Sequence, residues 1–141
     1  MNAQLKLVDT QADAFAHLAD FIKGNKIALL TSVTADGTLH SRPLSTRDVD
    51  FENNTLWFIA TSNFSKAEHI LHDREVALSY LSSDGQTYAS VSGRAQVVHD
   101  MDRTQELWSP MTATRFPLSV GDPRLVLLRV NVTAVEFWDA P

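Results

Sequence analysis

Cysteine is absent from the 141-residue chain, so disulfides, thiolate nucleophiles and cysteine-ligated metal sites are excluded. Glycine is scarce, at five residues, and neither a phosphate-binding P-loop nor a dinucleotide-binding fingerprint is present. No apolar run approaches the roughly 20 residues that a membrane-spanning helix needs. Residues 1–10 do not resemble a secretory signal, so we expect a cytoplasmic protein.

Positive charge is also in short supply. Twelve lysines and arginines stand against 17 acidic residues, and the net charge of -5 argues against general affinity for nucleic acid or an anionic membrane. The hydrophobic share of 44% is that of an ordinary globular domain, and the length suits a single core. Any anion that binds must therefore be held by local cations and backbone donors, against the overall field.

Apolar periodicity predicts one opening helix followed by a chain made mainly of strands. Apolar residues recur at helical spacing across residues 10–23, and Gly24 can end the helix. The period then changes to two, with Asp-Gly turn signals at Gly37 and Gly85. The expected strands cover residues 27–33, 38–49, 56–61, 76–81, 88–98 and 125–138, and two later helices cover residues 66–72 and 100–108. These elements indicate one α+β, mainly β, domain over residues 1–141: an antiparallel barrel or meander with flanking helices.

The strand at residues 38–49 carries an arginine among unusually small neighbours. Arg42 is flanked by Ser41 and Pro43, and Ser45 follows. Proline cannot donate to a strand ladder, so the strand is unpaired, bulged or at an edge there, which leaves backbone groups for a ligand. A guanidinium offers a planar fork that matches phosphate. By itself, Arg42 is explained equally well as an edge-strand arginine that deters aggregation.

A second polar stretch joins the strand at residues 56–61 to the next helix. Ser65 and Glu68 have the spacing of a capping box, and Lys66 lies in the first helical turn. A helix N-terminus carries about half a positive charge and free N–H groups, which suit an anion. Taken alone, the stretch is also typical of an ordinary capped helix with a solvated lysine. Together, the two stretches indicate a pocket for one phosphate and its attached ring.

These stretches resemble the flavin-binding split-barrel family, whose best-known member is pyridoxamine 5'-phosphate oxidase. The motifs that carry the resemblance are Ser-Arg-Pro-Leu at residues 41–44, Leu-Trp-Phe-Ile-Ala-Thr at 56–61 and the closing Val-Glu-Phe-Trp-Asp at 135–139. The general stress protein branch is the closer match. The resemblance implies a six-stranded antiparallel split β-barrel, and a homodimer with flavin mononucleotide (FMN) at its interface. It also implies hydride or electron transfer through the flavin, from a small-molecule or nicotinamide donor to an unidentified substrate.

The resemblance also assigns the residues of the site. Arg42 and Lys66 would hold the phosphate, with Ser65 assisting. Arg47 is a weaker candidate, at a position where oxidases commonly have a flavin-contacting lysine. The remaining candidates form two strand edges along the ring and ribityl chain: Pro43, Leu44 and Ser45 on one, and Ile59, Ala60 and Thr61 on the other.

Departures from the oxidase pattern leave other readings open. The oxidases have an arginine-lysine pair where this chain has Ser65 and Lys66, and no equivalent of their substrate-binding C-terminal segment follows, so vitamin B6 oxidation is not expected. A flavin carrier or sensor without turnover, or a pocket for deazaflavin or haem, are the alternatives. His69 and His72 are expected to be solvated rather than metal ligands. Trp108 is expected to pack at an interface or beside the flavin, and no catalytic acid or base is nominated.

Overall fold

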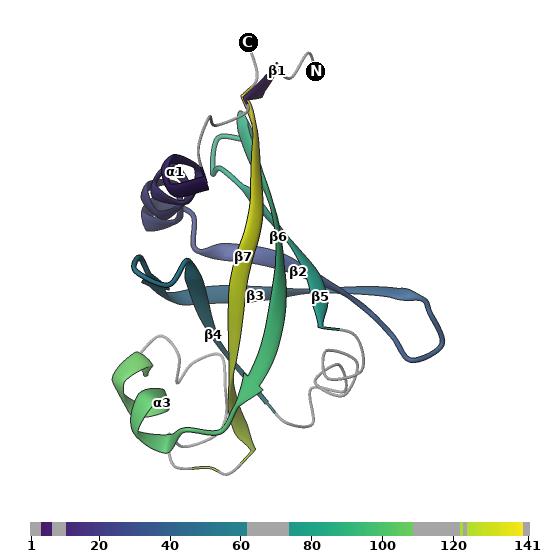
Figure 1. Cartoon of the computed structure of the whole chain (residues 1–141), viewed down its shortest axis with the longest axis vertical. Coiled ribbons are helices and arrows are strands. Elements are labelled where there is room, and N and C mark those ends of the chain that lie inside the picture. The colour runs from purple at the N-terminus through teal and green to yellow at the C-terminus, as the bar shows by residue number, and fades with distance from the viewer. Residues whose placement is uncertain (1–3, 7–10, 62–73, 109–121, 123, 140–141) are drawn as a thin grey trace.

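The computed structural model describes residues 4–6, 11–61, 74–108, 122 and 124–139, which form seven strands and two helices (Figure 1). The strands are β1 (Gln4–Lys6), β2 (Ile27–Val33), β3 (Leu39–Asp50), β4 (Thr55–Thr61), β5 (Glu75–Leu81), β6 (Thr87–Val98) and β7 (Leu125–Asp139). The helices are α1 (Gln11–Gly24) and α3 (Met101–Leu107). Strands β2 to β7 lie within one residue of the expected bounds, whereas β1 has no counterpart among the expected strands. The helix expected at residues 66–72 lies outside the described residues.

The strands close into a barrel. All pairings are antiparallel, in the order β1-β7-β4-β3-β2-β5-β6, and β6 also pairs with β7 along most of its length. Six strands, β2 to β7, therefore form a closed barrel, which confirms the expected split-barrel class. Strand β1 pairs only with the end of β7. Closure is favourable because it removes the free edges that an open sheet would expose.

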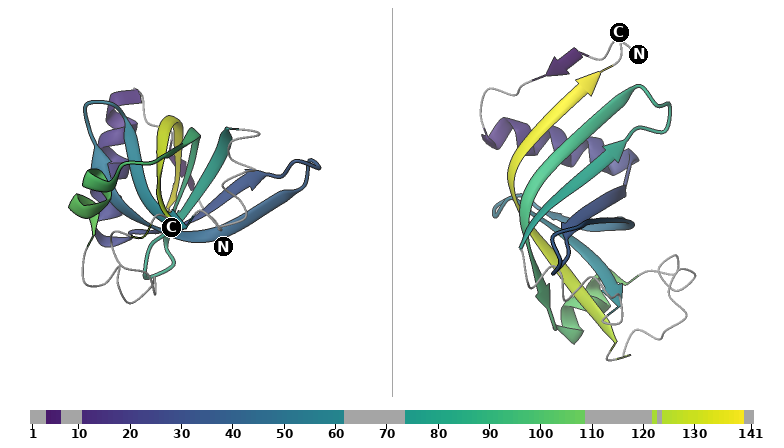
Figure 2. Two further views of the ribbon diagram at one scale, coloured as in Figure 1. Left: turned by 90° about the horizontal axis from the view of Figure 1, so that it is seen from below. Right: turned by 90° about the vertical axis from the view of Figure 1, so that its right-hand side faces the viewer.

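Alternate side chains of the strands fill the barrel, because successive residues in a strand point to opposite faces. Leu30 and Leu78 are fully buried in this core. Helix α1 adds Phe15, Leu18 and Ile22, whose spacing of three and four residues places them on one helical face. In Figure 1 and Figure 2, α1 lies beside one half of β7 and α3 beside the other. Neither described helix is long and apolar enough to cross a membrane.

Strand β4 is buried on both faces, as its continuous apolar sequence predicts. Leu56 and Phe58 join the barrel core. The opposite face packs into a second cluster, whose buried members are Ile59, Leu125 and Leu127. Trp108 and the end of α3 pack against that cluster. Trp108 therefore anchors α3 to the outside of the barrel.

Candidate functional site

Strands β3 and β4 pair beside their hairpin and then separate. Their ladder reaches the pair Thr46–Phe58 and is irregular at Arg47. Beyond that point, the pairs of β3 in the described chain are with β2, and those of β4 are with β7. Figure 1 shows the two strands running apart. Pro43 pairs with Leu29 of β2 and, among the described residues, with nothing on the β4 side. Of the three alternatives left open for it (unpaired, bulged or at an edge), the edge position agrees with this pairing.

The two faces of β3 differ in burial. Arg42, Leu44 and Thr46 point inward and are 7%, 6% and 4% exposed. On the opposite face Pro43 is exposed and Ser45 is half-buried. The candidate residues of β3 therefore divide between the inside of the barrel and its outer surface, and only the backbone of the strand is common to both.

Within the described residues, the guanidinium of Arg42 donates to three uncharged oxygen atoms. Its Nη1 donates to the carbonyl oxygens of Leu30, at 3.3 Å, and His40, at 3.0 Å, and its Nη2 donates to Ser32 Oγ at 2.8 Å. None of these three acceptors carries a charge, and burial lowers the pKa of Arg42 to about 10. Arg42 therefore stays protonated at neutral pH, in a place where its charge is poorly solvated.

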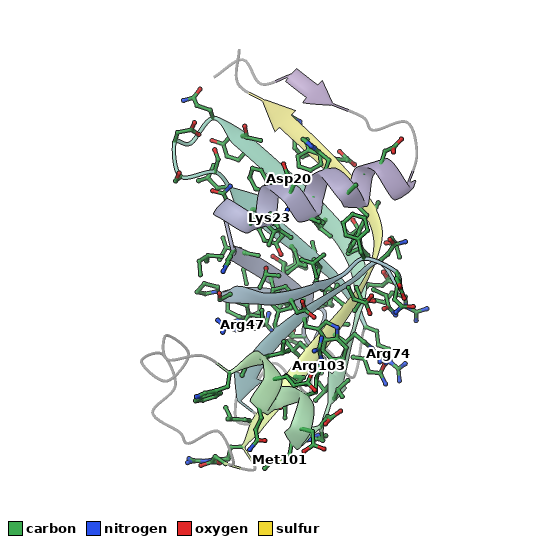
Figure 3. The ribbon with its side chains drawn as sticks, turned by 90° about the vertical axis from the view of Figure 1, so that its left-hand side faces the viewer. Asp20, Lys23, Arg47, Arg74, Met101 and Arg103 are labelled. Atoms are coloured by element: carbon green, nitrogen blue, oxygen red, sulfur yellow. The ribbon has the colours of Figure 1, made fainter. Side chains whose placement is uncertain are left out.

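Arg47 lies at the irregular position of β3 and connects it to α3. Its Nε and Nη2 donate to the carbonyl oxygen of Leu107, at 3.3 Å and 3.0 Å. In the reverse direction, Arg103 donates to Asp48 at 2.5 Å, and its guanidinium carbon lies 5.1 Å from the ring centroid of Trp57. Figure 3 shows Arg47 and Arg103 where β3 and α3 approach each other. The two arginines thus link the strand and the helix reciprocally and hold Arg47 in place.

A ligand at β4 would contact the backbone of the candidate residues rather than their side chains. Ile59 and Ala60 are 3% and 1% exposed, so a ligand along this edge would meet their backbone groups. Thr61 is the last residue of β4 and pairs with β7. Ser65 and Lys66 lie outside the described residues, as do the two histidines considered as metal ligands. The structure therefore places the β3 candidates on two different faces of one strand. The phosphate end at Ser65 and Lys66 stays a prediction.

Three residues that the sequence did not single out bear on the site: Ser32, Arg103 and Leu107. Ser32 is 1% exposed, and a small polar residue inside an apolar strand is a readable signal of a buried hydrogen-bond partner. The contacts of Arg103 and Leu107 join positions 55 and 60 residues apart, and no local pattern announces them. Within the described ranges, no three His, Cys, Asp or Glu side chains are grouped so that they could hold a metal ion.

A family model described as pyridoxamine 5'-phosphate oxidase like matches residues 13–141. The chain belongs to this family. Among curated proteins, this oxidase-like chain is similar to Protein bli-3 of Neurospora crassa, with 26% identity over 129 residues. The match covers 85% of this chain and 62% of bli-3, so the chain spans less than two thirds of that relative's length.

Several solved structures have a similar fold. A protein related to general stress protein 26, from Clostridium acetobutylicum, has a TM-score of 0.77 at 13% identity, covering 92% of this chain and 91% of that one. The general stress FMN/FAD binding protein of Xanthomonas citri has a TM-score of 0.76 at 21% identity, covering 92% and 90%. An F420 reductase has a TM-score of 0.63 at 22% identity, covering 82% and 93%. At these identities the likeness establishes the shared fold.

Proposed function

We propose that this member of the oxidase-like family is an FMN-binding protein of the general stress type, and that it transfers electrons through the flavin. The observation that carries the proposal is the separation of β3 from β4 beyond the pair Thr46–Phe58. It leaves the backbone of residues 43–45 on one strand edge and that of residues 59–61 on another. The FMN/FAD binding relative of Xanthomonas citri has the same fold, which supports a flavin as the ligand.

Arg42 supports binding of the flavin phosphate. Its side chain is buried, burial lowers its pKa to about 10, and within the described residues it donates to the carbonyl oxygens of Leu30 and His40 and to Ser32 Oγ. A phosphate matches the planar fork of the guanidinium, which is the reason for proposing Arg42 as a phosphate ligand. Ser65 and Lys66 are the proposed partners, at the N-terminus of the helix that the sequence predicts for residues 66–72, where free backbone N–H groups would favour phosphate. The set therefore fits one phosphate, with one cation fewer than the arginine-lysine pair of the oxidases supplies.

The ring and ribityl chain are assigned to the edge of Pro43, Leu44 and Ser45, with Arg47 at its end. Leu44 points into the barrel, and the outward side chains of Pro43 and Ser45 are small, so a flat ring can approach the backbone. The hydrogen bonds from Arg47 to Leu107 fix the direction of the guanidinium. Bound FMN would supply the redox chemistry, and the protein would supply position and electrostatics. The substrate and the electron donor are not identified by these residues.

A second copy of the chain is the proposed partner. Large apolar side chains are exposed on three neighbouring strands: Leu39 (73%) on β3, Leu29 (49%) and Ile27 (42%) on β2, and Leu81 (51%) on β5. Exposed apolar side chains suit a symmetric dimer, because the same apolar surface of each copy can then cover that of the other. Pro43 belongs to the same face, so a partner would cover the flavin edge. Sedimentation velocity tests this pairing.

Two experiments separate this function from its alternatives. A non-catalytic flavin carrier would bind FMN but would not be reduced by a nicotinamide donor, whereas the oxidoreductase would be reduced repeatedly under aerobic turnover. The likeness to an F420 reductase favours deazaflavin as the second candidate ligand. Parallel titrations with FMN and with F420, followed by absorbance, would decide between them. If the protein binds F420 more tightly than FMN, the proposed ligand is F420 and the FMN assignment is wrong.

A further inference from the structure

A hollow of about 550 Å³ lies between helix α1 and strand β3. This volume is in the range of roughly 300–1,000 Å³ that is typical of small-molecule sites. One wall comes from residues 16–23 of α1 and the other from residues 46–49 of β3. Lys26 and Phe51 also line the hollow. Figure 3 shows Asp20 and Lys23 of α1 on one side and Arg47 of β3 on the other. Among the flavin candidates whose side chains the structure describes, only Arg47 lines it.

The walls of the hollow are largely apolar. Ala19 and Ile22 are buried, and Val49 is half-buried. Phe51 touches Phe15 edge-on, with 5.6 Å between ring centroids, yet its side chain is 56% exposed. A phenyl ring exposed to this degree contributes little to the core and leaves an apolar surface free. The hollow therefore has a surface on which a ring-sized apolar body can pack.

The charges of the lining favour an anion. Three cations, Lys23, Lys26 and Arg47, stand against two carboxylates, Asp20 and Asp48. Asp48 is engaged at 2.5 Å by Arg103, which comes from α3 and is not part of the lining. Asp20 lies 3.9 Å from Lys23, and Lys26 forms no ion pair within the described residues. In a chain of net charge -5, this is a local excess of positive charge beside an apolar wall.

We propose that the hollow binds a small organic anion, with its apolar ring against Phe51 and its acidic group beside Lys26. The proposal goes beyond flavin binding and does not depend on it. It assigns a site between α1 and residues 46–49 of β3, separate from the proposed flavin edge at residues 43–45. Both carboxylates and phosphates fit this chemistry, and the probe below represents the carboxylates.

The probe is 2-naphthoate, with the uncharged 2-naphthalenemethanol as its matched control. Calorimetric titration of the flavin-free protein should show at least tenfold tighter binding of the acid than of the alcohol. Lys26→Gln should lower the affinity for the acid at least fivefold and leave the affinity for the alcohol unchanged. Phe51→Ser should lower the affinity for both compounds. Arg94→Gln, at a position outside the lining, should change neither. Equal binding of acid and alcohol, or an unaffected Lys26→Gln variant with a wild-type melting curve, would overturn the proposal.

A competition experiment separates this site from the proposed flavin site. Saturating FMN should leave the affinity for 2-naphthoate within twofold of its value without FMN. Competitive displacement of naphthoate by FMN would mean that the hollow belongs to the flavin site, and the inference would be wrong. If naphthoate binds as described and FMN does not bind at all, the proposed function fails while the separate anion site stands.

Discussion

The hydroxyl groups of Thr46 and Tyr80 lie 2.7 Å apart inside the barrel. Thr46 belongs to β3 and Tyr80 to β5, so the hydrogen bond crosses behind β2, which separates these strands in the sheet. Thr46 is also the position at which the ladder between β3 and β4 ends. Burial raises the pKa of Tyr80 above its usual value, so the phenol stays protonated and available as a donor. The bond therefore fixes the point where the strands separate.

Replacing Tyr80 with phenylalanine should cost about 1–3 kcal/mol of unfolding free energy, because the buried Thr46 hydroxyl loses its partner. Urea unfolding followed by circular dichroism measures the change. Tyr88→Phe is the matched control, since the Tyr88 hydroxyl forms no hydrogen bond in the described part of the chain, and it should change stability by less than about 0.5 kcal/mol. Equal effects of the two substitutions would contradict the assigned role of Tyr80.

The ion pair between Arg103 and Asp48 should show a measurable coupling energy. Their side chains are 27% and 40% exposed, so solvent screens the pair, and we expect a coupling of about 0.5–1 kcal/mol in a double-mutant cycle with Arg103→Met and Asp48→Asn. The coupling should shrink at 1 M salt, because the Debye length falls to about 3 Å. A coupling of zero at low salt would contradict a contribution of the ion pair to the attachment of α3.

Gly93 should not tolerate a side chain. A Cβ at this position would lie 2.6 Å from the carbonyl oxygen of Asn131 and 2.8 Å from Val130 Cγ1, where β6 shifts register against β7. Gly93→Ala should therefore destabilise the protein by about 1–3 kcal/mol in denaturant unfolding. Gly24→Ala provides the control, because nothing lies within 4 Å of its Cβ at the end of α1, and it should be neutral or stabilising by up to about 1 kcal/mol. The opposite ranking would contradict the close approach of β6 and β7.

The sequence did not predict which face of β3 points into the barrel. The alternation of residues 38–49 separates two faces, but each mixes apolar and polar residues, so neither is marked as the inside. In the structure Arg42 is 7% exposed and Leu39 is 73% exposed, the reverse of what their hydropathy suggests. Arg42 can be buried because Ser32 accepts a hydrogen bond from its guanidinium inside the barrel. Leu39 lies on the outer face with the other exposed apolar side chains of β2, β3 and β5.

The strands themselves were predictable, because each combines a period of two or a continuous apolar run with clear turn signals. Strand β1 was not, since its three residues carry no pattern and are fixed only by pairing with the far end of β7. Arg42 and Pro43 were enough to predict a candidate binding stretch on β3 from the sequence. The hydrogen bond from Arg47 to Leu107 of α3 joins residues that are far apart in the chain, so local sequence spacing does not predict it.

The carboxyl group of Asp36 should titrate at an unusually low pH. Hydrogen bonds from the hydroxyls of Thr34 and Thr38 lower its pKa from 3.8 to about 2. Because the folded-state pKa is depressed, the associated stability is fully present above pH 4 and is lost as the pH falls toward 2. Carboxyl NMR titration should give a midpoint near 2, and Thr34→Val should raise it. A midpoint that is unchanged in the variant would rule out the hydroxyl as the main cause.

Removing either proposed phosphate cation should weaken FMN binding. Arg42→Ala or Lys66→Ala should each cost about 1.5–3 kcal/mol of binding free energy, the scale of a hydrogen bond to a charged group. Fluorescence titration measures the affinities, and melting curves check that the Arg42 variant is folded. Arg94→Ala serves as a charge-matched control without a role in the site. Unchanged affinity in both variants would mean that the phosphate binds elsewhere.

The most direct test of the account is a titration of FMN with the wild-type protein after removal of any bound flavin. We expect saturable quenching of flavin fluorescence with one FMN per chain, together with a rise in melting temperature, because a ligand that binds only the folded state stabilises it. Absence of both quenching and thermal stabilisation at excess FMN would contradict the proposal that β3 and β4 separate to hold a flavin.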